Sequence, residues 1–213
     1  MRAPNSSFAI DVTDTLLMRL RQGDRAAFEQ VYRWFERPVF TLALRMCGDR
    51  EQAAEVLQET MLKVLDRIAD FRGHSGSGAG PGAGSGESRS PFWGWLRQIA
   101  INEALMALRR NRRSGDWLDI ADGPEPIDEI TPPPAAAADA ARLQRAMESL
   151  PTTTRAVLWL YHAEGYTHEE IAELMHRTPS FSKSQLSRGN RRLRALLEPE
   201  VLPMSAVAEV AHG

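Results

Sequence analysis

Apolar residues recur every three or four positions along most of the chain, a spacing that places them on one face of an α-helix. The alternation of apolar and polar residues expected of a half-buried β-strand is nowhere sustained. The pattern therefore predicts an all-α protein. Breaks in the pattern divide it into two small helical domains joined by a flexible acidic linker, the second being a four-helix helix-turn-helix domain.

The first predicted domain covers residues 14–113, after an N-terminal extension at 1–13. Its expected helices run from about Asp14 to Gln22, from Asp24 through a kink or restart at Pro38, from Gly48 and Asp49 to about Phe71, and from about Pro91 to Arg113. A stretch rich in glycine and serine, 73–90, precedes the last of these helices. Because this stretch has too few apolar residues to order itself, we expect a flexible loop.

The second predicted domain covers 135–198, between an acidic, proline-rich linker at 114–134 and a C-terminal tail at 199–213. Within it, Thr167 and Glu170 have the spacing of a capping box at a helix start. Thr178 and Pro179 are suited to cap and begin the last helix. Two helices joined by about three residues form the helix-turn-helix arrangement.

The formal net charge of -2 conceals a strong segregation of charge along the chain. Residues 177–197 hold six cations and no acid, and a second basic cluster covers 109–113. The acidic linker lies between these two clusters. Local basic clusters of this kind are the electrostatic signature of phosphate binding.

The last helix separates its cations from its apolar residues. At about 100° per residue, one face carries Leu186, Gly189, Leu193 and Leu197, and the opposite face carries Ser184, Ser187, Arg188, Arg191 and Arg192. Such a helix fits the DNA major groove, where serine, glutamine and arginine read base edges. The alternative is a solvated surface helix, although a solvated face normally mixes positive and negative charges. Gly189 is unusual in this helix, since it costs ~1 kcal/mol relative to alanine.

The helix after Gly48 has an apolar seam formed by Leu57, Met61, Val64, Ile68 and Phe71. Its opposite face carries Glu51, Glu55, Gln58, Glu59, Leu62 and Asp66. This face is either an ordinary solvated surface or a docking surface for a basic partner. Leu62, placed in the middle of an acidic stripe, favours docking.

The helix from Pro91 combines aromatic, amide and basic side chains. Trp95, Gln98, Asn102 and Arg109 share one side of it, and the basic cluster Arg109, Arg110, Arg112 and Arg113 ends it. Rings beside cations are typical of single-stranded nucleic acid binding, because bases stack on the rings while cations hold the backbone. Some of the aromatic residues must instead fill the hydrophobic core. We expect Phe92 to be buried with Leu96 and Ile99, and Trp95 to face the solvent.

The sequence offers no pattern typical of an enzyme, a cofactor site or a metal site. A single cysteine, Cys47, cannot form an internal disulfide, and the five histidines match no zinc spacing. No glycine-rich phosphate loop follows a strand, and no nucleophile lies beside a suitable base. No run of about 18 apolar residues is present, and the N-terminal segment lacks the apolar stretch of a secretion signal. We therefore expect a cytoplasmic protein without membrane insertion.

Four segments in order, AAEVLQETMLKVL, FWGWLRQIAINEALMALRRNRR, LPTTTRAVLWLYHAEGYTHEEIAELM and KSQLSRGNRRLRALL, resemble the extracytoplasmic-function (ECF) sigma factors of bacterial RNA polymerase. The resemblance covers about 24–72, 91–113 and 140–197. It implies a transcription initiation factor that binds core RNA polymerase and promoter DNA, with an anti-sigma factor or other regulator as a further partner. One departure is the segment from Gln52 to Glu55, which has fewer carboxylates than the family commonly carries there.

The resemblance also implies a role for each set of residues already singled out. Core polymerase would dock on Glu55, Gln58, Glu59 and Leu62. The minus-ten promoter element would be recognised and held open by Trp95, Gln98, Asn102, Arg109, Arg110, Arg112 and Arg113. The minus-thirty-five element would be read by Lys183, Ser184, Gln185, Arg188, Arg191 and Arg192. The alternative function is a helix-turn-helix regulator that binds duplex DNA without being a polymerase subunit.

Overall fold

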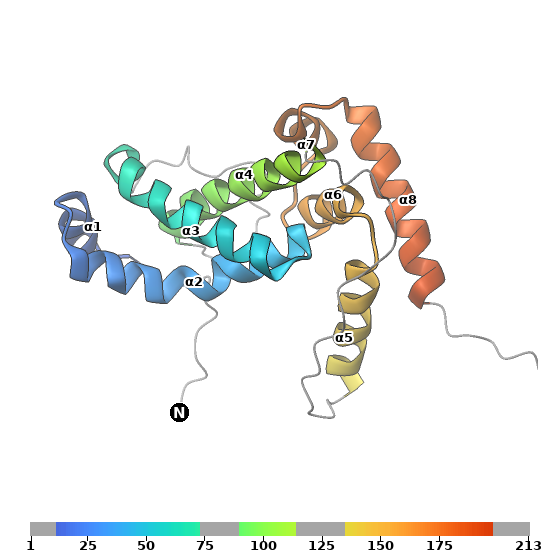
Figure 1. The fold of residues 1–213 in the computed structure, drawn as a ribbon, viewed down its shortest axis with the longest axis horizontal. Helices are drawn as coiled ribbons and strands as arrows, with labels where there is room; N and C mark the ends of the chain where they lie inside the picture. The colour runs from blue at the N-terminus through green and yellow to red at the C-terminus, as the bar shows by residue number, and fades with distance from the viewer. Residues whose placement is uncertain (1–11, 73–89, 114–134, 198–213) are drawn as a thin grey trace, which may run out of the picture.

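A computed structural model of the protein describes residues 12–72, 90–113 and 135–197, which form eight α-helices and one short 3-10 helix (Figure 1). These residues include no β-strand, which confirms the all-α prediction. The predictions made for the N-terminal extension, the glycine-rich loop, the linker and the C-terminal tail fall almost entirely outside the described residues. None of the described helices is both long enough and apolar enough to cross a membrane.

The first group of helices is α1 (Asp14–Arg21), α2 (Arg25–Cys47), α3 (Arg50–Arg67), η2 (Ile68–Asp70) and α4 (Pro91–Arg113). Side chains of Thr13, Asp24 and Asp49 accept hydrogen bonds from backbone N–H groups in the first turns of α1, α2 and α3. The helix α2 continues through Pro38 without the predicted restart. It ends at Gly48, whose φ of 73° is in the left-handed region.

The second group is α5 (Ala135–Glu148), α6 (Thr152–His162), α7 (His168–Met175) and α8 (Pro179–Leu197). The predicted capping box is present, because Thr167 and Glu170 each accept a hydrogen bond from the other's backbone N–H. The Thr178 hydroxyl oxygen likewise accepts from the N–H of Phe181, 3.3 Å away, at the start of α8. Only residues 176–178 separate α7 from α8, so these helices have the predicted helix-turn-helix connection.

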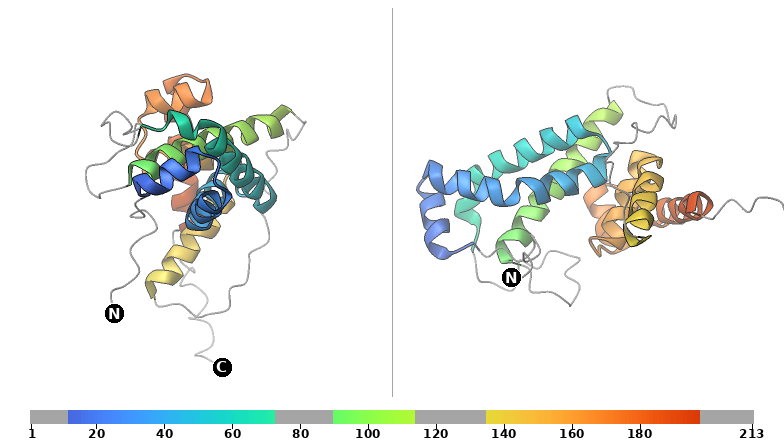
Figure 2. Two further views of the ribbon diagram at one scale, coloured as in Figure 1. Left: turned by 90° about the vertical axis from the view of Figure 1, so that its left-hand side faces the viewer. Right: turned by 90° about the horizontal axis from the view of Figure 1, so that it is seen from below.

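The helices α2, α3 and α4 pack against one another and form the centre of the first group (Figure 2). Their buried face includes the stacked rings of Phe35 and Trp93, whose centroids are 5.9 Å apart. The second group lies against this centre, with α6 on α2 and α7 on α4. Buried residues of the second group, among them Val157, Leu160 and Ile171, belong to the same apolar cluster as the first group. One hydrophobic core therefore connects the two groups.

Candidate nucleic-acid and polymerase interfaces

The helix α8 presents its cations outward. It buries Ser182 and Gly189, while the predicted DNA-reading residues Lys183, Ser184, Arg188, Arg191 and Arg192 are all exposed. We call these five residues the recognition face. No carboxylate among the described residues forms an ion pair with a cation of this face. The face can therefore accept phosphates without first breaking an internal ion pair.

Gln185, the remaining predicted reading residue, lies at the edge of the packed side of α8. It is half-buried, and its side-chain carbonyl accepts a hydrogen bond from the Thr154 hydroxyl at 2.7 Å. This bond joins α8 to α6. In the described conformation the Gln185 carbonyl therefore uses one of its two lone pairs to hold α8 on α6.

Gly189 allows α8 to approach α6 closely. A Cβ atom at this position would lie 2.5 Å from a terminal methyl of Leu158 and 2.8 Å from the Thr154 methyl. Both distances are well inside ordinary van der Waals contact. The glycine that is unfavourable for an isolated helix is thus required by the packing of the helix-turn-helix domain.

A histidine fixes α7 against α8. The Nδ1 atom of His168 lies 3.0 Å from the hydroxyl of the fully buried Ser182, and the ring of Tyr161 stacks on the imidazole with 4.8 Å between centroids. These three side chains come from α7, α8 and α6 respectively. Sequence reasoning missed this cluster of side chains, because none of the three residues stands out by periodicity or charge.

The predicted docking residues Glu55, Gln58, Glu59 and Leu62 are all exposed on α3, and we call them the acidic face. The apolar seam on the other side of α3 is buried as predicted, with Leu57 only partly covered. Leu62 remains 47% exposed, and Leu65, one turn further along, remains 40% exposed. Exposed leucines beside carboxylates are consistent with a protein-docking surface as well as with a solvated one.

Arg110 links α4 to the acidic face. Its guanidinium lies 3.5 Å from a carboxylate oxygen of Glu55, and both side chains are largely exposed. An exposed pair at this distance contributes little to stability. The pair shows instead that the acidic face and the basic end of α4 are adjacent surfaces. The side chains of Arg112 and Arg113 lie outside the described part of α4.

The predicted DNA-facing side of α4 is only partly open. Asn102 is exposed, whereas Trp95, Gln98 and Arg109 are half-buried. The ring of Trp95 lies 5.3 Å from that of Phe71 and 5.5 Å from that of Phe92 between centroids. Trp95 therefore belongs partly to the aromatic core, and only part of its ring faces the solvent. Phe92 is buried with Leu96 and Ile99, as predicted.

The second group of helices contacts this same side of α4. The Tyr166 hydroxyl, just before α7, donates a hydrogen bond to the side-chain carbonyl of Gln98 at 2.7 Å. Burial raises the pKa of Tyr166, which keeps the hydroxyl protonated as a donor. The Arg109 guanidinium donates a hydrogen bond to the backbone carbonyl of Leu174 in α7, with 3.5 Å between nitrogen and oxygen.

A buried ion pair joins the two groups beside these contacts. Arg97 of α4 pairs with Glu164, which lies between α6 and α7, and both side chains are about nine-tenths buried. The indole N–H of Trp159 donates a second hydrogen bond to Glu164 at 3.0 Å. Removing either charge would leave the other buried without its partner, which is strongly unfavourable.

Arg155 of α6 forms a further connection between the groups. Its buried guanidinium donates to the carbonyl of Cys47 at the end of α2 and, at 3.0 Å, to the carbonyl of Glu148 at the end of α5. A cation at helix C-termini is favoured by unpaired carbonyls and by the helix dipole. Burial lowers the pKa of Arg155 and raises the pKa of the Cys47 thiol to about 12.

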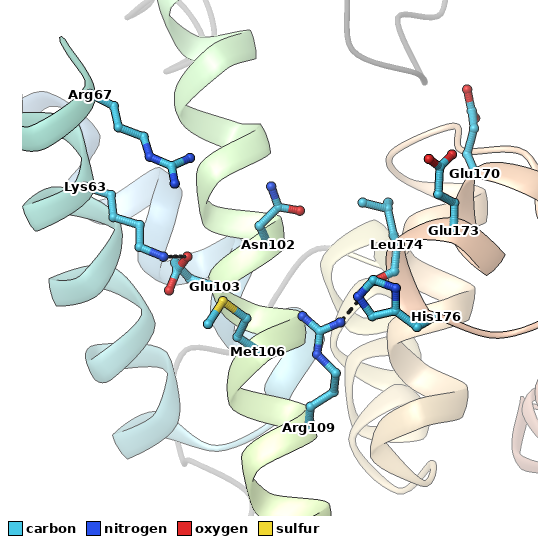
Figure 3. Close-up of a pocket in the computed structure, with 10 residues that line it drawn as sticks. All are labelled: Lys63, Arg67, Asn102, Glu103, Met106, Arg109, Glu170, Glu173, Leu174 and His176. Atoms are coloured by element: carbon cyan, nitrogen blue, oxygen red, sulfur yellow. Dashed lines mark hydrogen bonds and ion pairs between the residues drawn. The ribbon is translucent and has the colours of Figure 1, made fainter. Parts of the chain in front are cut away.

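An open pocket of about 410 Å³ lies between α3 and α4 on one side and α7 on the other (Figure 3). The α3 and α4 side contributes Lys63, Arg67, Asn102 and Arg109, together with Glu103, which pairs with Lys63. The α7 side contributes the carboxylates of Glu170 and Glu173. The pocket thus places acidic residues of α7 opposite cations of the first group.

Comparisons with known proteins give one family match within each of the two helical groups. Residues 31–77 match the family model described as Sigma-70 region 2, and residues 140–193 match Sigma-70, region 4. The RNA polymerase sigma-H factor of Pseudomonas aeruginosa is 26% identical over 194 residues, covering 86% of this chain and 93% of that protein.

Further relatives carry the ECF designation. The ECF RNA polymerase sigma factor SigM of Mycobacterium tuberculosis is 29% identical, covering 82% of this chain and 79% of that protein. The ECF RNA polymerase sigma-E factor of Haemophilus influenzae is 27% identical, covering 90% of this chain and 98% of that protein. The solved structure of the sigma factor RpoE with the anti-sigma factor NepR from Bartonella quintana has a TM-score of 0.48 and 20% identity, covering 81% of this chain and 98% of that one.

The two family regions occur in one chain, region 2 before region 4, and similarity to the curated relatives extends across most of its length. The resemblance seen in the sequence is confirmed: this chain matches both Sigma-70 regions and is similar to ECF sigma factors over most of its length.

Proposed function

We propose that this protein binds core RNA polymerase and directs it to specific promoters, by recognising minus-thirty-five and minus-ten elements and aiding DNA melting. It acts as a transcription initiation factor in the cytoplasm, without enzymatic activity of its own. An anti-sigma factor or another regulator is a further expected partner. The single observation that carries the proposal is the recognition face, whose exposed cations lie on the second helix of a helix-turn-helix.

Each surface has a proposed role. The recognition face, on the helix that Gln185 holds on α6, reads the minus-thirty-five element in the major groove. The side of α4 with Trp95, Gln98, Asn102 and Arg109, extended by Arg110, Arg112 and Arg113, holds the minus-ten element. The acidic face docks on core polymerase. Residues 14–113 and 135–198 then form the two working domains, connected by a linker at 114–134 that allows both promoter elements to be contacted at once.

Run-off transcription tests the proposal. Purified chain is added to core RNA polymerase on a library of promoter fragments, and transcripts are expected only when both proteins are present. Transcription that does not depend on the chain, together with tight binding of the isolated chain to duplex promoters, would instead indicate a regulator that acts without polymerase.

The docking role has its own test. The double variant Glu55→Lys with Glu59→Lys should retain its helical content, since both residues are exposed, yet should lose co-purification with core polymerase. The double variant Glu36→Lys with Asp139→Lys changes two exposed carboxylates elsewhere by the same charge and is the matched control. Equal yields of polymerase with both double variants would show that the acidic face is merely solvated.

A further inference from the structure

The start of α8 carries one aromatic side chain that the roles described above leave unexplained. Phe181 is the only aromatic residue of this helix, and it is half-buried. Leu186 of the same helix packs against the hydrophobic core, whereas Phe181 does not belong to the apolar residues of the described chain that do so. Core packing therefore does not account for the ring.

Helical geometry places Phe181 beside the recognition face. Ser184 and Arg188 follow it at three and seven positions along the chain, so the three residues lie on one side of α8. The buried residues Ser182 and Gly189 mark the side that packs against other helices. In a helix-turn-helix, the N-terminal residues of the second helix contact base edges in the major groove. Phe181 therefore extends the recognition face at the end of α8 that approaches the bases.

A cation lies over the Phe181 ring. The guanidinium carbon of Arg177, in the turn between α7 and α8 (Figure 1), is 5.6 Å from the ring centroid. A guanidinium over an aromatic face is attracted by the electrons of the ring, so it restrains the ring's orientation. Arg177 is exposed and forms no ion pair with any carboxylate of the described residues. Its charge thus remains available for a phosphate.

The DNA feature that suits this pair of side chains is a thymine next to a backbone phosphate. In the major groove, the C5-methyl group of thymine is the apolar feature that a phenylalanine ring can contact. Cytosine presents an N–H donor there instead, and covering this donor with a ring would leave it without a hydrogen-bond partner. The ring therefore favours thymine over cytosine, while the guanidinium fixes the position of the helix on the backbone.

We propose that Phe181 is a specificity-determining residue, which reads the methyl group of a thymine at one edge of the minus-thirty-five element. Arg177 is the positioning residue, which orients the ring and binds the adjacent phosphate. This inference rests on the proposed function, because it takes α8 as the helix that enters the major groove. It adds a base-reading residue of a different chemistry, apolar contact, to the polar residues already assigned to that element.

Promoter selection provides the first test. Core RNA polymerase with the unmodified chain, or with Phe181→Ala, binds promoter fragments randomised across the minus-thirty-five element, and the bound fragments are sequenced. The unmodified chain should enrich thymine at one edge position, and Phe181→Ala should lose this preference but keep the others. Leu196→Ala removes an exposed apolar side chain near the other end of α8 and is the matched control. Absence of a thymine preference, or its persistence in Phe181→Ala, would overturn the inference.

Removal of the methyl group alone separates base reading from a structural role of the ring. In a selected fragment the enriched thymidine is replaced by deoxyuridine, which lacks only this methyl group. The polymerase complex of the unmodified chain should bind the deoxyuridine fragment about fourfold more weakly, as expected for one methyl-sized group left uncovered. The complex of Phe181→Ala should bind both fragments equally. A variant that weakens binding to both fragments by the same factor would show that the ring is only structural.

The role of Arg177 is tested with two substitutions. Arg177→Lys keeps the charge but loses the planar group over the ring, so it should reduce the effect of the methyl group and retain the salt dependence of binding. Arg177→Gln should reduce the methyl effect and also lower the salt slope by about one. Arg33→Gln makes the same charge change at an exposed residue of α2 and should alter neither. A methyl effect unchanged in both Arg177 variants would overturn the positioning role.

Circular dichroism verifies that each variant remains helical. The proposed function is judged separately, by whether transcription with core polymerase depends on the chain. If transcription depends on the chain but the deoxyuridine substitution has no effect, the proposed function stands and only this inference fails.

Discussion

Replacing Gly189 by alanine should destabilise the protein, although alanine is the better helix former. Within α8 the substitution gains ~1 kcal/mol of helix propensity. Against this gain, the new Cβ would lie 2.5 Å from a Leu158 methyl, about 1 Å inside the ordinary contact distance of ~3.5 Å. Leu158 is 1% exposed, so a shift of its side chain would displace other buried groups. Overpacking of this kind costs about 1–3 kcal/mol, so we expect a net loss of up to ~2 kcal/mol.

The effect should depend on Leu158. In a Leu158→Ala background, which alone costs about 2–5 kcal/mol, the nearer obstructing methyl is absent, and only the Thr154 methyl remains within 3 Å of the new Cβ. The cost of Gly189→Ala should therefore fall by at least ~1 kcal/mol, a coupling expected only for residues in direct contact. Urea unfolding followed by circular dichroism measures all four proteins of the cycle. Gly189→Ala that stabilises the unmodified protein by ~1 kcal/mol, or that has the same effect in both backgrounds, would refute the packing argument.

Three further predictions concern the recognition face, the end of α2 and the buried thiol. Arg188→Ala and Arg191→Ala should each weaken binding to the upstream promoter element. Replacing an arginine that contacts a base should cost about 1–3 kcal/mol of binding free energy and relax sequence specificity, whereas replacing one that contacts a phosphate should lower the salt slope of the binding constant by about one. Unchanged binding at every salt concentration would argue against both roles. Gly48→Ala should lower the free energy of unfolding in urea by at least ~2 kcal/mol more than Gly23→Ala does. Both glycines have a left-handed φ, so the backbone cost is shared. Only at Gly48 would the new Cβ meet a buried guanidinium, that of Arg155, at 2.0 Å. Burial raises the pKa of Cys47 from 9.0 to about 12, so the folded protein binds the thiol proton more tightly than the unfolded chain does. The contribution of this thiol to the free energy of unfolding is therefore complete below pH 9 and declines between pH 9 and 12 by at most ~1.4 kcal/mol per pH unit. Cys47→Ala should lack this part of the decline, and parallel pH curves for the two proteins would contradict the shift.

Local rules were sufficient to predict the helices and the faces that they present. The bounds of α4, the capping box of Thr167 and Glu170 and the cap at Thr178 all depend on residues within four positions of one another. The exposure of the recognition face and of the acidic face follows from the same periodicity, since a helix has only one side to bury. These features could be read from the sequence because the forces behind them act within one or two helical turns.

The contacts between the two groups of helices could not be predicted in this way. Arg97 and Glu164 form a pair only because the fold brings α4 against the start of the helix-turn-helix, and nothing in either neighbourhood identifies the partner. Trp95 is half-buried because Phe71 and Phe92 reach it from the hydrophobic core, although its position on α4 alone predicts exposure. The unfavourable helix residue Gly189 becomes a packing requirement once Leu158 lies against it. Tertiary structure decides such cases because desolvation and close packing depend on which distant side chains share a space, and helical periodicity specifies only which side of each helix faces inward.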